Sequence, residues 1–352
     1  MSRCKMDQIQ RAEITLLQSL QETFPDHETL ILAISRFGAP KNAFLLCFPI
    51  AFCVFGARSG LQILWVAVLS EWLNAVLKWL MMGQRPYWWV MESPVYMGEE
   101  RPFLKQFKIT CETGPGCPSG HAMVTTAVWF VFVSSLNEMI LSEVKNSHNA
   151  KMATRITWTL YGIVSVLVCV SRVYTATHFP HQVILGSVTG VLLASVIRQY
   201  PVENYGFGSY FLLGLFFLVS IFIEYYLISL VGLDPAWSFK LALKRCVYRE
   251  WVHLDTTLFY AISRDVGAFV FAGMICSCLT VNYERTRGQY VMKMTATLLT
   301  IAAALVIDTM YVPRRYIVLF YILGAFKSGL VSVSTVALNQ IVSSFSRQNP
   351  NL

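Results

Sequence analysis

The segment Pro118-Ser119-Gly120-His121 places anion-binding and proton-transferring groups directly before a long apolar run. Pro118 suits the first position of a helix, because it lacks the amide proton that would have no partner there. Ser119 and Gly120 would then offer free backbone N–H groups at the positive end of the helix dipole, which favours anions. Taken alone, the segment is better explained as an ordinary helix start, with His121 as an interfacial side chain.

Two basic residues precede this segment at a helical spacing. Lys78 and Arg85 are seven residues apart, so they would project from nearly one face of a helix. Gly83 is expected to fray that helix, and Pro86 disfavours helical backbone at Arg85. Both long side chains could converge on one small anion. The alternative is that they extend toward the membrane surface, which is common for basic residues at span ends.

A third polar group ends a later apolar run. Arg172 and His178 are six residues apart and would point about 120° apart on a continuous helix, so convergence requires the helix to end between them. Pro180 supports such an end, because the next helix would begin at or after it. His181 competes with His178 for a chemical role. We expect His181 inside the new helix, as a supporting or interfacial residue.

Together these residues describe a site for a highly charged anion such as phosphate. One neutral imidazole could attack phosphorus, and one imidazolium could protonate the departing alkoxide. The sequence contains no Asp/Glu/His cluster with the spacing of metal ligands. We therefore predict a reaction without metal or cofactor, with basic side chains stabilising the charge. The predicted site comprises Lys78, Arg85, Ser119, Gly120, His121, Arg172 and His178.

The composition predicts an all-α, polytopic membrane protein with one domain over residues 1–352. Hydrophobic residues make up 55% of the 352-residue chain and charged residues 14%, against about a quarter charged in soluble domains. The apolar residues form blocks long enough to cross hydrocarbon as helices. The formal charge is +8, but the basic residues are scattered over loops, which favours a membrane surface or an anionic substrate over nucleic acid. Residues 1–29 are polar and predict no signal peptide.

We expect nine spans, and alternate loops must then lie on opposite sides of the membrane. The site residues and the loop at 233–258 share one side. The loops at 142–155 and 281–293 lie on the other side and carry a small excess of Lys and Arg, which predicts a cytosolic location. The N-terminus would be lumenal and the C-terminus cytosolic. The spans are expected near 31–56, which Arg36 and Lys41 interrupt, and near 60–82, 120–141, 156–177, 181–198, 209–232, 259–280, 293–311 and 316–342.

The three motifs, in this order, resemble the type-2 phosphatidic acid phosphatase superfamily. The matching segments are KWLMMGQRP at 78–86, PSGH at 118–121 and SRVYTATHFPHQ at 171–182. One position departs from the usual pattern, because Gln182 stands where most of the superfamily has Asp. That resemblance implies a membrane-embedded helical phosphatase core.

The surrounding sequence is more similar to the glucose-6-phosphatase catalytic subunits. WLN, RPYWWV, TCETGPG, SGHAM, HFPHQV and EWVHLDTT carry the likeness, which is weakest at residues 1–30 and 280–352. It implies nine spans in the endoplasmic reticulum, a lumenal site, glucose 6-phosphate as substrate and coupling to a glucose-6-phosphate transporter. By the same resemblance, His178 is the nucleophile that becomes phosphohistidine and His121 donates the proton. The other five site residues hold the phosphoryl oxygens.

The sequence leaves the subtype, a loop disulfide and two alternative functions open. SEWLN and SRDVGA are similar to the broadly expressed third form of the family. Ala39 stands where that family is expected to have Asp, and Cys117 replaces the usual Ser. Cys111, Cys117 and Cys246 lie in loops, so one loop disulfide is an open question. A lipid phosphate phosphatase and a transporter of phosphorylated anions are the alternative functions.

Overall fold

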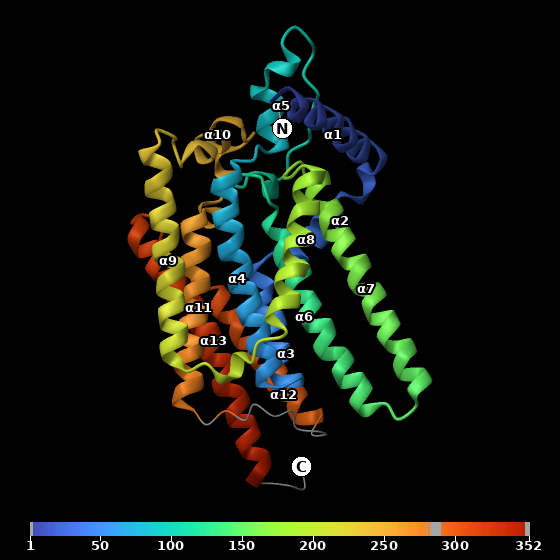
Figure 1. Ribbon diagram of the computed structural model, residues 1–352, viewed down its shortest axis with the longest axis vertical. Helices are drawn as coiled ribbons and strands as arrows, with labels where there is room; N and C mark the ends of the chain where they lie inside the picture. Colours follow the sequence, from blue (N-terminus) through green and yellow to red (C-terminus); the bar gives the residue numbers. More distant parts are fainter. Residues whose placement is uncertain (1–2, 280, 282–289, 349–352) are drawn as a thin grey trace.

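The computed structural model describes residues 3–279, 281 and 290–348, and these residues form a helical bundle (Figure 1). The described part of the chain contains helices and no β-strand, as the sequence predicts; Glu112 and His253 form one isolated bridge. The helices are α1 (Arg3–Thr23), α2 (Glu28–Phe37), α3 (Phe48–Val54), α4 (Ala57–Met81), α5 (Pro86–Glu92), α6 (Gly120–Glu143), α7 (Ser147–Tyr174), α8 (Pro180–Ile197), α9 (Phe207–Leu230), α10 (Trp237–Arg245), α11 (Leu258–Cys278), α12 (Tyr290–Asp308) and α13 (Ile317–Gln348).

The first predicted span, 31–56, is wrong as a single helix. It is divided into α2, a π-helical turn at Ala43–Cys47, and α3. The break falls at residues 38–40, where Pro40 cannot donate a backbone hydrogen bond and disfavours helical backbone before it. Within the described residues, eight other helices are long and apolar enough to cross a membrane. The nine predicted spans therefore correspond to eight helices of spanning length and one broken segment.

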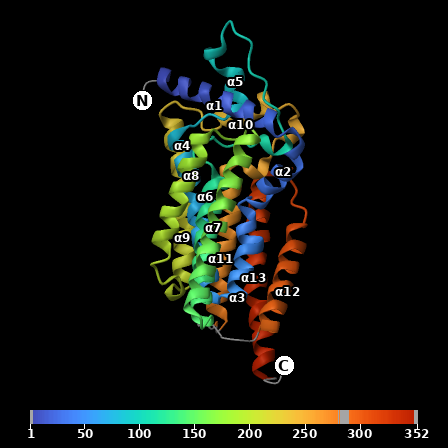
Figure 2. The same ribbon diagram turned by 90° about the vertical axis from the view of Figure 1, so that its right-hand side faces the viewer.

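The two ends of the bundle carry different elements. Figures 1 and 2 show α1, α5 and α10 at the end that holds the N-terminus, whereas α13 runs to the opposite end, near the C-terminus. The connections after α4, between α7 and α8, and after α9 lie at the N-terminal end, and the turn between α6 and α7 lies at the other. The predicted site segments thus share one end. Most of the predicted loop 281–293 lies outside the described residues.

Helix α4 lies at the centre of the bundle, where most of its side chains are buried. It packs against α3, α6, α8, α9 and α11. Its three indoles have hydrogen-bond partners, as buried indoles need: Trp65 Nε1 donates to Tyr210 Oη at 2.9 Å, Trp72 Nε1 to Ser220 Oγ at 2.8 Å and Trp79 Nε1 to the carbonyl oxygen of Pro235 at 3.3 Å. This packing fixes the C-terminal half of α4, which carries Lys78.

Two glycines of α8 allow it to approach the start of α6 closely. A Cβ on Gly190 would lie 2.3 Å from the carbonyl oxygen of Met123, and a Cβ on Gly186 would lie 2.6 Å from that of Ser119. Small residues permit such backbone contact between membrane helices. The contact brings the N-termini of α6 and α8 together, and with them the segments that carry His121 and His178.

A disulfide joins Cys111 to Cys246, with their Cα atoms 5.7 Å apart. It connects the loop before α6 to the residue that follows α10. The sequence left this pairing open, because Cys117 also lies in a loop. Cys117 is instead a buried free thiol.

Candidate active site

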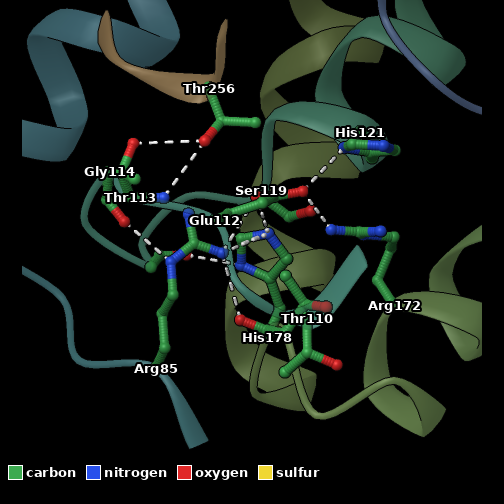
Figure 3. A network of polar contacts seen from close by, with 12 residues as sticks. Arg85, Thr110, Glu112, Thr113, Gly114, Ser119, His121, Arg172, His178 and Thr256 are labelled. Carbon is green, nitrogen blue, oxygen red and sulfur yellow. Dashed lines mark hydrogen bonds and ion pairs between the residues drawn. The ribbon is translucent and has the colours of Figure 1, made fainter. Parts of the chain in front are cut away.

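The side chain at the centre of the site is Glu112, which the sequence analysis did not select. Its carboxylate lies among two arginines and two histidines, and Figure 3 shows all four directed toward it. The Glu112 backbone is held by Tyr87 Oη, which donates to its carbonyl oxygen at 3.0 Å, and by the bridge to His253. We call the basic side chains Lys78, Arg85 and Arg172, together with His121 and His178, the cation cage.

Arg85 reaches the cage from extended backbone. Helix α4 ends at Met81, and Met82 adopts a left-handed conformation with φ 45° that redirects the chain. Arg85 has φ −110° and ψ 149° before Pro86, as the proline predicts. Its fully buried guanidinium donates to Glu112 Oε2 at 3.0 Å and to the carbonyl oxygens of Gly114, Pro115 and Thr177 at 2.7, 3.2 and 3.2 Å. These carbonyl contacts fix its position.

Arg172 approaches the carboxylate from the opposite side, at the C-terminal end of α7. Its Nη2 atom donates to Glu112 Oε1, and its Nη1 atom donates to Ser35 Oγ at 2.8 Å. Its Nε atom is buried and has no partner among the described residues. Arg172 therefore keeps one unused donor for an anion larger than a carboxylate.

Lys78 completes the cationic side of the cage. It is buried on α4 and lies near the glycine-containing loop, where a Cβ on Gly114 would be 3.7 Å from its Nζ atom. Its ammonium group makes no hydrogen bond or ion pair with the described residues, although the charges of Arg85 and Glu112 act on it. Its donors are thus available to a ligand.

His178 is fully buried in the short connection between α7 and α8. Helix α7 ends at Tyr174 and α8 begins at Pro180, so the predicted break between Arg172 and His178 is present. The Nδ1 atom lies 2.7 Å from the carbonyl oxygen of Gly116, which can only accept, so Nδ1 carries the proton. The Nε2 atom keeps its lone pair and lies 3.4 Å from Arg85 Nη1 and 3.8 Å from Glu112 Oε2.

Charge and burial set the protonation states of the central pair. Burial lowers the pKa of His178 well below its ordinary value, and Arg85 lowers it further, which keeps the imidazole neutral. Burial would raise the pKa of Glu112, but Arg172 and Arg85 outweigh it and hold that pKa well below its ordinary value. The structure therefore places a neutral imidazole beside a fixed negative charge in the cage.

The PSGH segment differs in detail from the expectation. Helix α6 begins at Gly120 with Ser119 as its N-cap, and Ser119 Oγ accepts from the Ala122 amide at 3.4 Å. Pro118 precedes the cap and does not occupy the first helical position, because the serine side chain takes the capping role. The Ser119 amide is not free either, since it donates to the carbonyl oxygen of Gln182 at 3.0 Å.

Gly120 and His121 remain in the first turn of α6, where backbone N–H groups have no partner within the helix. The Nδ1 atom of His121 lies 3.7 Å from Glu112 Oε1. Unlike His178, the His121 side chain is partly exposed, and it lines the cavity described below.

His181 lies outside the cage. It is in the first turn of α8, where its Nδ1 atom is 2.8 Å from Glu13 Oε2 and its amide donates to Glu13 Oε1 at 3.0 Å. This contact joins α8 to α1. The structure places His178, and not His181, beside Arg85 and Glu112.

A cavity of about 260 Å³ adjoins the cage. Five members of the site line it on one side, namely Lys78, Glu112, Gly120, His121 and Arg172. Arg85, Ser119 and His178 do not line it; all three are fully buried, and Arg85 and His178 contact Glu112, which does line it. Among the described residues, no group of three His, Cys, Asp or Glu side chains is placed to hold a metal ion.

The chain is similar to known phosphatases. A model of the PAP2 superfamily matches residues 59–205, a stretch that contains the whole predicted site. Glucose-6-phosphatase 2 of Homo sapiens is 35% identical over 343 residues, covering 94% of this chain and 95% of the relative. Glucose-6-phosphatase catalytic subunit 1 of Bos taurus is 36% identical, covering 91% and 90%, and that of Haplochromis nubilus is 39% identical, covering 76% of each.

No solved structure matches the chain. The three relatives are named as form 2 and subunit 1, so they do not test the resemblance to a third form. Their identity over most of both chains nevertheless confirms the resemblance found in the motifs: the chain belongs to the glucose-6-phosphatase family.

Proposed function

We propose that this chain, as one integral membrane phosphatase domain over residues 1–352, hydrolyses glucose 6-phosphate to glucose and inorganic phosphate in the cation cage. The observation that carries the proposal is the position of Glu112, whose carboxylate is an anion held by Arg85 and Arg172 beside both histidines. The phosphoryl group of the substrate takes that position when Glu112 moves aside. The names of the relatives support glucose 6-phosphate as the sugar phosphate.

The first chemical step transfers the phosphoryl group to His178. Its neutral Nε2 atom forms a bond to phosphorus while the bond from phosphorus to the sugar oxygen breaks. His121 gives its proton to that oxygen, which leaves as the hydroxyl of glucose. Arg85, Arg172 and Lys78 hold the equatorial oxygens, assisted by Ser119 Oγ and the Gly120 amide, and stabilise their charge in the transition state.

The second step returns the enzyme to its starting state. Water attacks phosphorus and the nitrogen–phosphorus bond breaks, while His121 accepts a proton from the water. Inorganic phosphate leaves and the Glu112 carboxylate can reoccupy the cage. The side chains of the cage provide the charge stabilisation throughout, so we propose that no metal ion or other cofactor takes part.

We further propose that the site faces the lumen of the endoplasmic reticulum. The N-terminus would then be lumenal and the C-terminus cytosolic. The Cys111–Cys246 disulfide supports this orientation, because it lies at the same end as the site and disulfides persist in oxidising compartments. Substrate made in the cytosol would need a glucose-6-phosphate transporter in the same membrane.

The deciding experiment measures phosphate release by the purified full-length protein with EDTA present. We expect release from glucose 6-phosphate and much slower release from a phosphatidic acid. Faster release from the lipid would favour a lipid phosphate phosphatase. Binding and transmembrane movement of the sugar phosphate without any hydrolysis would favour a transporter. Activity that disappears with EDTA and returns with magnesium would contradict the metal-independent step.

A further inference from the structure

The cavity beside the cage continues away from the phosphoryl position toward a second set of polar side chains. At that end it is lined by Glu71 and Asn74 of α4 and by Arg264 of α11. Glu71, Asn74 and Lys78 are three and seven residues apart, which places them along one face of α4. One helix face therefore runs from the cage into the second set.

Glu71 is a buried acid without a close partner. Its side chain lies within the membrane-spanning helix α4, and the residue is 8% exposed. The carboxylate makes no hydrogen bond or ion pair with the described residues, although the charges of Asp265, Arg264 and Lys78 act on it from farther away. A buried charge is costly unless hydrogen bonds compensate it. The position of Glu71 in the cavity wall allows a ligand to supply those bonds.

Arg264 offers the complementary group. Its Nε atom donates to Asp265 Oδ1 at 2.6 Å, which fixes the plane of the guanidinium. Its Nη2 atom is buried without a hydrogen-bond partner among the described residues. Helices α4 and α11 pack against each other, so the same cavity presents an unused acceptor from α4 and an unused donor from α11.

From this arrangement we infer that Glu71 and Arg264 form a polyol subsite that binds the hydroxyl groups of the substrate. A sugar hydroxyl both donates and accepts, so a carboxylate and a guanidinium in one wall can bind neighbouring hydroxyls. A volume of about 260 Å³ lies just below the range of about 300–1,000 Å³ for ligand pockets, which suits a single sugar ring. A phosphatidic acid has no hydroxyls to pair with these groups, because both of its remaining glycerol oxygens are esterified with fatty acids.

Ala39 makes this assignment specific to the present chain. It lies in the wall of the same cavity, at the position where the family is expected to carry Asp, and its methyl group cannot bond to a hydroxyl. The recognition of hydroxyls must then depend on other wall residues. Glu71 and Arg264 have the unused hydrogen-bonding capacity that this requires.

The inference rests on the proposed function, and the test compares two substrates that share a phosphoryl group. Glucose 6-phosphate carries hydroxyls, whereas p-nitrophenyl phosphate presents an aromatic ring without them. We expect Glu71→Gln to lower kcat/KM for glucose 6-phosphate by about 10- to 100-fold, the range for a lost hydrogen bond to a charged group. For p-nitrophenyl phosphate the change should stay within about twofold. Arg264→Lys keeps the charge but loses the planar donors. It should likewise lower kcat/KM for glucose 6-phosphate and leave that for p-nitrophenyl phosphate nearly unchanged.

Glu224→Gln is the matched control. Glu224 is a carboxylate in the spanning helix α9 that also lacks hydrogen-bond partners among the described residues, but it is absent from the cavity wall. The Glu224→Gln change should leave kcat/KM unaltered for both substrates. An equal loss on both substrates in Glu71→Gln and Arg264→Lys would overturn the subsite and indicate a structural role. Unchanged kinetics in both variants would overturn it as well.

A binding measurement separates failure of the subsite from failure of the proposed function. In a His178→Ala background, which prevents turnover, glucose 6-phosphate should bind more tightly than inorganic phosphate, and Glu71→Gln should remove the difference. Equal affinity of the His178→Ala protein for glucose 6-phosphate and inorganic phosphate would overturn the subsite. If the unmodified enzyme hydrolyses other phosphate esters but not glucose 6-phosphate, the proposed function fails, and this binding comparison still decides whether the subsite exists.

Discussion

The Nδ1 atom of His178 lies 2.7 Å from the carbonyl oxygen of Gly116 and 3.3 Å from Gln182 Oε1. The backbone carbonyl of Gly116 is therefore the closer acceptor. Gln182 stands at the position where the resemblance to the wider superfamily predicts an aspartate. A carbonyl fixes the tautomer of the imidazole without adding a negative charge. Gln182 mainly holds the connection itself, because its side chain accepts from the Phe179 amide and donates to the Gln84 carbonyl.

Gln182→Ala should accordingly reduce stability more than it reduces chemistry. The lost hydrogen bonds leave buried backbone groups without partners, which costs about 1–3 kcal/mol each and should lower the Tm of the purified protein. Gly116 still orients His178, so we expect kcat for glucose 6-phosphate to fall by no more than about tenfold. Rapid-quench detection of the phosphoenzyme measures this directly. A loss as complete as that of His178→Ala would assign the orienting role to Gln182.

Glu112→Gln should strengthen the binding of anions in the cage. The carboxylate now competes with an incoming phosphoryl group for Arg85 and Arg172, and the amide competes less because it is neutral. We expect the inhibition constants of inorganic phosphate and orthovanadate to fall by about tenfold, given the strength of a charged hydrogen bond. Vanadate should also inhibit the unmodified enzyme, as an analogue of the transition state.

The control for this change is Glu92→Gln. Glu92 pairs with Lys244 and Arg245 away from the cage, and its loss should leave both inhibition constants unchanged. Weaker anion binding in Glu112→Gln would mean that the carboxylate holds the arginines in place for substrate and does not compete with it.

Local sequence rules predicted the parts of the site that depend on backbone chemistry. The proline after Arg85 forced extended backbone, and Pro180 ended the helix between Arg172 and His178, as expected. The first segment was expected as one span because apolar residues flank the break at Pro40 on both sides, although Arg36 and Lys41 interrupt the run. The Ser119 amide was expected to be free, but the contact between α6 and α8 brings the Gln182 carbonyl to it, and sequence spacing does not reveal that contact.

Glu112 was missed for a different reason. The motifs predict cations that bind an anion, and an acid in the intervening loop has no helical or strand period to indicate where it points. Its TCETGPG segment was noted only as part of the family likeness. The signal available in sequence was an acidic residue beside a loop cysteine, between two cationic motifs on the same side of the membrane.

The orientation of the site can be tested with introduced cysteines. Cys111 is in the disulfide and Cys117 is 4% exposed, so neither native thiol is a suitable reporter. Met97→Cys lies in the exposed loop at the N-terminal end, and Lys145→Cys lies in the turn between α6 and α7 at the other end. In sealed microsomes an impermeant maleimide should label Lys145→Cys at once and Met97→Cys only after the membrane is opened. The unmodified protein gives the background, and the reverse pattern would place the site in the cytosol.

Removal of each histidine should produce a different defect. His178→Ala removes the nucleophile, so no phosphoenzyme should form and turnover should disappear on every substrate. His121→Ala removes the proton donor for a sugar alkoxide, which is a poor leaving group, so turnover of glucose 6-phosphate should fall by about 10²–10⁴-fold. The leaving group of p-nitrophenyl phosphate barely needs a proton, and the His121 variant should retain much more activity on it.

His181→Ala serves as the control, because its imidazole pairs with Glu13 outside the cage. It should form phosphoenzyme from radioactive substrate in rapid-quench experiments, with at most a loss of stability from the broken contact between α8 and α1. The labelled species should be lost in acid and retained in base, as phosphohistidine is. Labelling of the His178 variant together with loss in the His181 variant would move the nucleophile to His181. That outcome would require α8 to rotate its first turn into the cage, since Glu13 now holds both the amide and the ring of His181.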